Sequence, residues 1–193
     1  MPSWTKFAAV GVVIALWVMG VYNGLVTMRT QIDANWAQVE VQYQRRADLI
    51  PQLVSTVQGA ANFEQGTLVA VTEARTQWLN TKNDPNASLD SQIQSANNFD
   101  SALSRLLVTV ESYPQLTATE TFKTLQDQLE GTENRVAVAR KDFNETVTPY
   151  NVKTQRFPGN IVAKLFGFDK YPFFESAAGS ENAPEVKFDF NNK

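Results

Sequence analysis

The chain has 193 residues, a formal net charge of −3, and neither cysteine nor histidine. This length is enough for one domain with a substantial core. The missing residue types exclude disulfide scaffolds, thiolate and imidazole metal sites, and nucleophilic systems that need cysteine or histidine. The acidic balance, with no run of lysine or arginine longer than two, argues against nucleic acid as a partner.

The first long segment is apolar. Residues 7–26, FAAVGVVIALWVMGVYNGLV, carry no charge, and Asn23 is their only strongly polar side chain. About 20 such residues cross the hydrocarbon core of a bilayer as a helix. We therefore predict an uncleaved transmembrane anchor over residues 1–27. A cleaved signal peptide with Lys6 as its positive region is the alternative, disfavoured by the long apolar run and by the lack of a small-residue cleavage site.

The side of the membrane is only weakly indicated. Lys6 precedes the apolar run and Arg29 follows it, so the positive-inside rule gives little bias. We expect a single-pass protein of the cell (inner) membrane with the bulk of the chain outside the cytoplasm.

Beyond the anchor, apolar residues recur every third or fourth position, which is the period of an amphipathic helix. The first such stripe runs from Leu25 to Ala61 and predicts a helix continuous with the anchor. Asn62, with Gln65 three residues later, predicts the capped start of a second helix, whose stripe ends at Trp78 before the turn-rich NTKNDPNAS.

A third stripe, from Leu89 to Tyr113, stops at Pro114. The sequence from Thr117 to Glu120 has the form of a capping box for a fourth helix, bent or ended near Pro149. No segment predicts a strand.

These helices predict an all-α fold: a transmembrane helix that continues into an antiparallel four-helix bundle over residues 28–157, with long first and fourth helices. In that arrangement the end of the fourth helix, near Phe157, returns to the bilayer beside residues 22–28. The aromatic-rich tail, residues 158–193, is expected near the membrane-proximal end. Packing against the bundle is the favoured fate of its aromatic side chains, contact with lipid is the alternative, and the two are compatible.

The stretch RRADLIPQLV, residues 45–54, places charges and a proline inside the first helix. Arg46 falls at a stripe position and is expected to point inward, whereas Arg45 and Asp48 can pair on one face. Pro51 lacks the N–H that would bond the carbonyl of Ala47, so that carbonyl needs another donor.

We hypothesise that Arg45 or Arg46 bonds this carbonyl or a carboxylate on a neighbouring helix, which would make a rigid polar cluster inside the bundle. Glu73 and Glu111 are the candidate carboxylates. Solvated charges beside a kink are the alternative, because surface ion pairs are the commoner class.

Several ordered blocks resemble the LemA family of bacterial membrane proteins over nearly the whole chain. They are YNGLVTMR, ANWAQVEVQYQRRADLIPQLV, AANFE and YNVKTQRFPGNIVAKLFGF. The resemblance implies a single-span protein with an antiparallel four-helix bundle, without established catalytic activity or cofactor; one relative takes part in forming the magnetosome membrane compartment. At Asn62-Phe63-Glu64 the chain lacks the histidine that many members carry before the glutamate, so no role of that histidine transfers.

The two longest blocks supply the candidate structural and interaction residues: Arg45, Arg46, Asp48, Pro51, Tyr150, Asn151, Phe157, Pro158, Phe166 and Phe168. No catalytic, metal or cofactor-binding residue is predicted. The favoured function is a membrane-anchored helical scaffold or adaptor that organises a membrane or a protein complex. Its expected partners are the lipid bilayer, further copies of itself and another membrane protein. The alternative is a membrane-tethered sensor or ligand-binding helical bundle, and an enzyme is disfavoured because the usual catalytic partners are missing.

Overall fold

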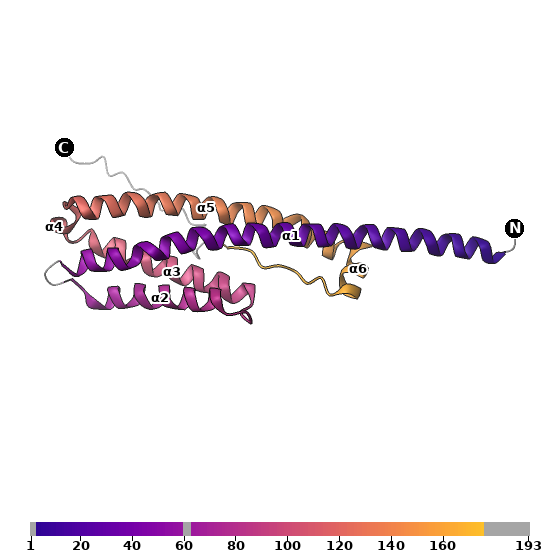
Figure 1. The fold of residues 1–193 in the computed structure, drawn as a ribbon, viewed down its shortest axis with the longest axis horizontal. Helices are drawn as coiled ribbons and strands as arrows, with labels where there is room; N and C mark the ends of the chain where they lie inside the picture. Colours follow the sequence, from indigo (N-terminus) through magenta and orange to yellow (C-terminus); the bar gives the residue numbers. More distant parts are fainter. Residues whose placement is uncertain (1–2, 60–62, 176–193) are drawn as a thin grey trace, which may run out of the picture.

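The computed structural model describes residues 3–59 and 63–175, and all regular secondary structure in those ranges is helical (Figure 1). The helices described are α1 (Ser3–Gln58), α2 (Gln65–Asn83), α3 (Leu89–Val110), α4 (Pro114–Thr117), α5 (Glu120–Gln155) and α6 (Gly159–Phe166). The all-α class predicted from the apolar periodicity is confirmed for this part of the chain.

Helix α1 is a single helix of 56 residues, which corresponds to about 80 Å at 1.5 Å per residue. Its N-terminal part extends beyond the other helices (Figure 1) and leaves large apolar side chains uncovered, among them Phe7 at 77%, Val13 at 66% and Leu16 at 61% exposure. Within the described ranges, α1 is the one helix long and apolar enough to cross a membrane.

The C-terminal part of α1 is covered by the other helices. Helix α5 lies along α1, while α2 turns back beside the end of α1 and α3 lies against α2 (Figure 1). Helices α2 and α3 have 19 and 22 residues, so they are too short to accompany α5, with 36 residues, over its whole length. Helix α6 packs instead against α1 and α5 near the exposed apolar part of α1.

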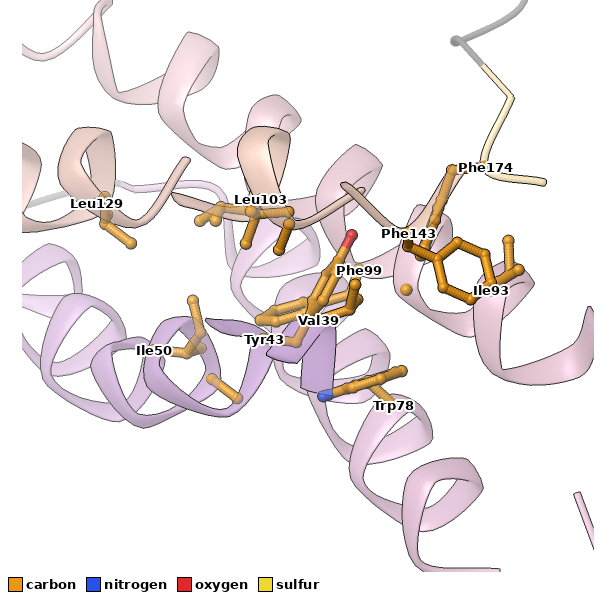
Figure 2. Close-up of a cluster of buried hydrophobic side chains, with 14 of the residues drawn as sticks. Val39, Tyr43, Ile50, Trp78, Ile93, Phe99, Leu103, Leu129, Phe143 and Phe174 are labelled. Atoms are coloured by element: carbon orange, nitrogen blue, oxygen red, sulfur yellow. The ribbon is translucent and has the colours of Figure 1, made fainter. Parts of the chain in front are cut away.

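One contiguous core joins these helices. Each stripe predicted from the sequence contributes fully buried members, including Tyr43, Trp78, Phe99 and Phe143. Figure 2 shows Tyr43 lying close to Val39 and Phe99, and its ring centroid is 4.9 Å from that of Trp78. The core sits between α1, α2, α3 and α5 and reaches the C-terminal segment through Phe174.

The helix ends differ from the predicted ones in detail. Helix α2 begins at Gln65 with Glu64 at its N-cap, and the predicted cap, Asn62, lies outside the described residues, as does the tail beyond residue 175. Helix α5 runs through Pro149 to Gln155 rather than ending at the proline.

A short helix, α4, separates α3 from α5 and was not predicted. Pro114 begins it, in agreement with the preference of proline for the first position of a helix. Thr117 belongs to α4 and therefore does not cap α5. The cap is Thr119, whose hydroxyl accepts a hydrogen bond from the N–H of Phe122 at 3.3 Å.

Candidate functional site

A charged residue lies at the centre of the helical core. Arg46 of α1 is 1% exposed. Its Nη1 donates to Oδ1 of Asp100 on α3, and its Nη2 donates to Oε2 of Glu133 on α5 at 2.5 Å. The guanidinium group presents several donors in a fixed fork, so one side chain holds three helices in a defined relation.

Asp100 is shared with a second arginine. Arg140 of α5 donates to Oδ2 of Asp100 and to the hydroxyl oxygen of Tyr43, and the Tyr43 hydroxyl donates to the same Oδ2 at 2.6 Å. We call these five residues, Arg46, Tyr43, Asp100, Glu133 and Arg140, the arginine cluster. Its two guanidinium groups balance its two carboxylates, which reduces the free-energy cost of burying charge.

Burial, reinforced by the negative charge of Asp100, raises the pKa of Tyr43 well above its ordinary value. The tyrosine therefore keeps its proton and remains a hydrogen-bond donor at any physiological pH. Arg140 also lies over the ring of Phe174, with its Cζ 4.6 Å from the ring centroid. The arginine cluster thus contacts the C-terminal segment as well as α1, α3 and α5.

The carboxylate partners of Arg46 are not the predicted ones. They are Asp100 and Glu133 rather than Glu73 and Glu111. Glu111 lies about three helical turns beyond Asp100, at the C-cap of α3. Arg45 and Asp48 are exposed, and Asp48 accepts a hydrogen bond from Gln44 at 2.8 Å rather than from Arg45.

The carbonyl freed by Pro51 does find an arginine donor, although from another helix. Nε of Arg75, on α2, donates to the carbonyl oxygen of Ala47 at 2.7 Å. Helix α1 is continuous through the proline. This bond also ties α2 to α1 beside the arginine cluster.

Two asparagines on α5 hold the C-terminal segment. Nδ2 of Asn151 donates to the carbonyl oxygen of Tyr171 at 2.9 Å, while Oδ1 of Asn151 accepts from the N–H of Tyr171 at 3.0 Å. Asn144, two helical turns earlier, makes the same pair of bonds with Phe174, at 2.8 and 3.0 Å. We call Asn144 and Asn151, with the backbone that they hold, the asparagine clamp.

Side-chain packing adds to the asparagine clamp. The hydroxyl of Tyr150 donates to the carbonyl oxygen of Asp169 at 3.0 Å, and burial together with Tyr171 raises the pKa of Tyr150 to about 12. Phe168 and Phe174 are buried, and the ring centroid of Phe174 lies 5.8 Å from that of Trp36. These two phenylalanines therefore pack against the helices, as the favoured interpretation of the aromatic tail predicts.

Other aromatic residues of the same region remain open to solvent. Phe157 is 75% and Phe166 49% exposed, and Pro158 at the start of α6 is exposed too. Rings of Phe166 and Phe168 meet the ring of Tyr22 at centroid distances of 5.0 and 5.5 Å. The end of the apolar run in α1 therefore contacts α6 directly.

A cavity of about 320 Å³ opens between α3, α4 and α5, and Arg46 is among the residues that line it. Apolar side chains and carboxylates both line it: Leu103, Leu107, Val110, Phe122 and Leu129, with Asp100, Glu111, Glu130 and Glu133. Within the described ranges, no group of three acidic residues is placed to hold a metal ion.

Sequence reasoning missed Asp100, Glu133, Arg140, Arg75 and Asn144. A signal for three of them exists in hindsight: Asp100, Arg140 and Asn144 each directly follow a buried stripe residue, namely Phe99, Ala139 and Phe143. A polar residue at such a position flanks the buried face of its helix and can reach a partner on the neighbouring helix.

A family model described as the LemA family matches residues 35–188 of this chain. The chain belongs to the LemA family. The resemblance carried by its ordered blocks is thereby confirmed, and the match includes both the arginine cluster and the asparagine clamp.

Curated relatives of this LemA-family chain bear two kinds of name. The chain is 27% identical over 175 residues to "Magnetosome protein MamQ 2" of Paramagnetospirillum magneticum, covering 80% of this chain and 64% of that protein. It is 28% identical over 180 residues to "Magnetosome protein MamQ" of Magnetospirillum gryphiswaldense, covering 82% and 66%. It is 22% identical over 159 residues to "Protein LemA" of Metamycoplasma hominis, covering 82% and 71%. The chain thus spans slightly less than two thirds of the length of the MamQ relatives.

Proposed function

We propose that this LemA-family chain is a membrane-anchored helical scaffold or adaptor without catalytic activity. The observation that carries the proposal is the continuity of α1, which is one helix from Ser3 to Gln58. Its apolar part is exposed, whereas its later part holds the arginine cluster in the core. A helix that is bare at one end and packed along one face at the other suits a rigid connection between a bilayer and a helical domain.

In this proposal residues 1–27 form the anchor, residues 28–157 an antiparallel four-helix bundle made mainly by α1, α2, α3 and α5, and residues 158–193 a tail at the membrane-proximal end. The contact of Phe166 with Tyr22 supports the last point, because it holds α6 beside the end of the apolar run in α1. The cell (inner) membrane is the proposed location, with the bulk of the chain outside the cytoplasm. The names of the MamQ relatives, as magnetosome proteins, favour a role at a membrane compartment.

A scaffold needs bound partners, which in this proposal are further copies of the chain or another membrane protein. A single transmembrane helix has little to contact within the bilayer except lipid or other helices, and Gly11 and Gly20 leave open space on its surface where another helix can approach. We therefore propose that the anchor provides lateral contacts while the helical domain sets their spacing.

Two measurements on native membranes test this function. The full-length chain should stay in the membrane pellet after extraction with alkaline carbonate, and photo-crosslinkers at residues 11 and 20 should give products of about twice the chain's mass, or adducts with one other membrane protein. Release by carbonate would contradict the anchor. Retention without any protein crosslink from either position would contradict the scaffold role.

The cavity between α3 and α5 favours a second candidate function, a tethered sensor for a small organic cation with an apolar body. Its volume lies at the lower end of the range for ligand sites, and Glu111 and Glu130 in its lining, which are outside the arginine cluster, complement a cation. A thermal-shift series comparing hexylamine with hexanoate tests this candidate. Stabilisation by the amine alone, lost in Glu130→Gln and retained in Glu145→Gln, would support it, and no shift with either compound would contradict it.

A further inference from the structure

Helix α6 is packed on one side and bare on the other. Val162 and Ala163 are 2% exposed, whereas Ile161 is 57% and Leu165 73% exposed. Phe157, four residues before Ile161 and just ahead of the helix, is 75% exposed. Ile161 and Leu165 lie four positions apart within the helix and so share one side. Together with the exposed ring of Phe157, which precedes the helix, we call this side the α6 face.

The α6 face lies beside the end of the apolar run in α1. Phe166 meets Tyr22 edge-on at 5.0 Å, and Tyr22 is near the end of the uncharged stretch, residues 7–26. About 20 helical residues span the hydrocarbon core, so a bilayer placed on that stretch ends at the level of α6. The exposed apolar surface of α1 and the α6 face are then continuous with each other.

Charge near α6 differs from that of the whole chain. Residues 153–170 contain four basic residues, Lys153, Arg156, Lys164 and Lys170, and one acidic residue, Asp169, although the chain carries a net charge of −3. Arg156 and Lys164 are exposed, close in sequence to the α6 face. Exposed apolar residues with lysine and arginine beside them are the composition of segments that lie in the headgroup region of a membrane with anionic lipids.

We propose that the α6 face rests in the headgroup region of an anionic phospholipid surface, as a second membrane contact beside the anchor. This inference rests on the proposed anchoring of α1. Because α6 is packed against both α1 and α5, its contact with lipid fixes how far the helical domain leans over the bilayer. An anchor alone leaves the domain free to tilt, whereas an anchor with a lateral contact holds it in one orientation.

The chain contains no cysteine, so single-cysteine variants can be labelled cleanly. A fluorophore is attached at Leu165→Cys in the full-length chain, reconstituted into vesicles of phosphatidylcholine alone or mixed with phosphatidylglycerol. Nitroxide quenchers are carried on the lipid headgroups. The matched control is Val108→Cys on α3, where the parent side chain is 65% exposed against 73% for Leu165.

We expect severalfold stronger quenching at residue 165 than at residue 108, and a further increase when phosphatidylglycerol is included. The double variant Arg156→Gln, Lys164→Gln should lose that increase. Lys123→Gln, which removes one exposed charge near the start of α5, should keep it.

Carbonate extraction of the same vesicles separates the possible failures. Protein that is released would overturn the anchor and this inference together. Protein that stays integrated, but whose residue 165 is quenched no more than residue 108, would overturn the inference alone, as would a crosslink from residue 165 to a second copy in place of lipid quenching. Equal quenching at residue 165 in both kinds of vesicle would overturn the assignment to anionic lipid.

Discussion

Arg46 on α1 and Asp100 on α3 form an ion pair between residues that lie 54 positions apart in the chain. Arg46 is almost completely buried, whereas Asp100 retains 21% exposure and is shared with Arg140. The arginine cluster therefore depends on Asp100 more than on either arginine, since the two guanidinium groups share this one carboxylate. This asymmetry leads to the first prediction.

Asp100→Ala should lower the free energy of unfolding by about 3–5 kcal/mol, the usual cost of removing one partner from a buried ion pair. Arg46 would then keep only Glu133, whose side chain is 68% exposed. Arg46→Leu should cost less, because Asp100 keeps Arg140 and the new side chain is apolar. Urea titration in mild detergent, followed by circular dichroism, measures both changes.

Lys141→Ala serves as the control for that comparison. Its ion pair with Glu145 spans 3.4 Å between side chains that are 71% and 64% exposed. An exposed pair of this spacing on a helix contributes about 0.3–0.5 kcal/mol. Asp100→Ala with an effect as small as that of Lys141→Ala would show that the arginine cluster does not hold the helices together.

The second prediction concerns the asparagine clamp. Asn151→Ala removes both hydrogen bonds to residue 171, and each buried backbone group left without a partner costs about 1–3 kcal/mol. We expect faster amide exchange and faster proteolysis over residues 169–174, with little effect on α2 or α3. Asn134→Ala, at an exposed position on the same helix, is the matched control. Unchanged exchange at residues 169–174 in Asn151→Ala would contradict the clamp.

A third prediction couples Pro51 to Arg75. In the parent chain Arg75→Ala should cost about 1.5–3 kcal/mol, the range for a hydrogen bond from a charged group. Pro51→Ala restores the N–H that bonds the Ala47 carbonyl, so in that background the loss of Arg75 should cost clearly less. A double-mutant cycle measures this coupling. Equal costs in the two backgrounds would mean that Arg75 does not act on the carbonyl freed by the proline.

The fourth prediction is a pH dependence. An unfolded tyrosine has a pKa of about 10, whereas burial raises the pKa of Tyr150 to about 12. The folded state thus favours the protonated form, so its contribution to stability is complete below about pH 10 and is lost as the pH rises towards about 12. The free energy of unfolding of the parent chain should fall across this window, and that of Tyr150→Phe should fall less steeply.

The slope, rather than the level, identifies the effect of Tyr150. Phenylalanine also loses the hydrogen bond to the carbonyl of Asp169, which lowers the free energy of unfolding by the same amount at every pH. Parallel curves for the parent and Tyr150→Phe between about pH 9 and about pH 12 would show that Tyr150 ionises equally in both states.

The sequence predicted the helices well because burial repeats at the helical period. Leu25 to Val57, Leu89 to Val110 and Phe122 to Tyr150 are stripes whose members are buried as expected, except for Met28, Trp36 and Leu89, which are half-buried. The same reasoning predicts that Arg46 points inward, since it falls at a stripe position, and its side chain is 1% exposed. The contact of Phe166 with Tyr22 fits the expected return of the chain to the end of the apolar run.

The partners of these residues could not be predicted in the same way. Whether Arg46 meets Asp100 on α3 or Glu111 at its C-cap depends on the relative rotation and axial shift of two helices, which periodicity within each helix does not contain. Asn144 and Asn151 bind backbone atoms of an irregular segment, and the pattern of side chains in the sequence does not indicate where those backbone atoms lie. Arg75 shows the same limit, because Pro51 indicates an unpaired carbonyl without indicating which helix supplies the donor.

The most direct measurement is a nitroxide scan along α1 in the full-length chain reconstituted in vesicles. Single-cysteine labels at residues 10, 13 and 16, whose side chains are 57%, 66% and 61% exposed, are compared with a label at residue 41, which is 43% exposed. We predict that the first three collide readily with oxygen and hardly with a water-soluble nickel complex, and that residue 41 shows the reverse. Equal access of the nickel complex to all four positions would show that α1 does not carry the helical domain on a bilayer.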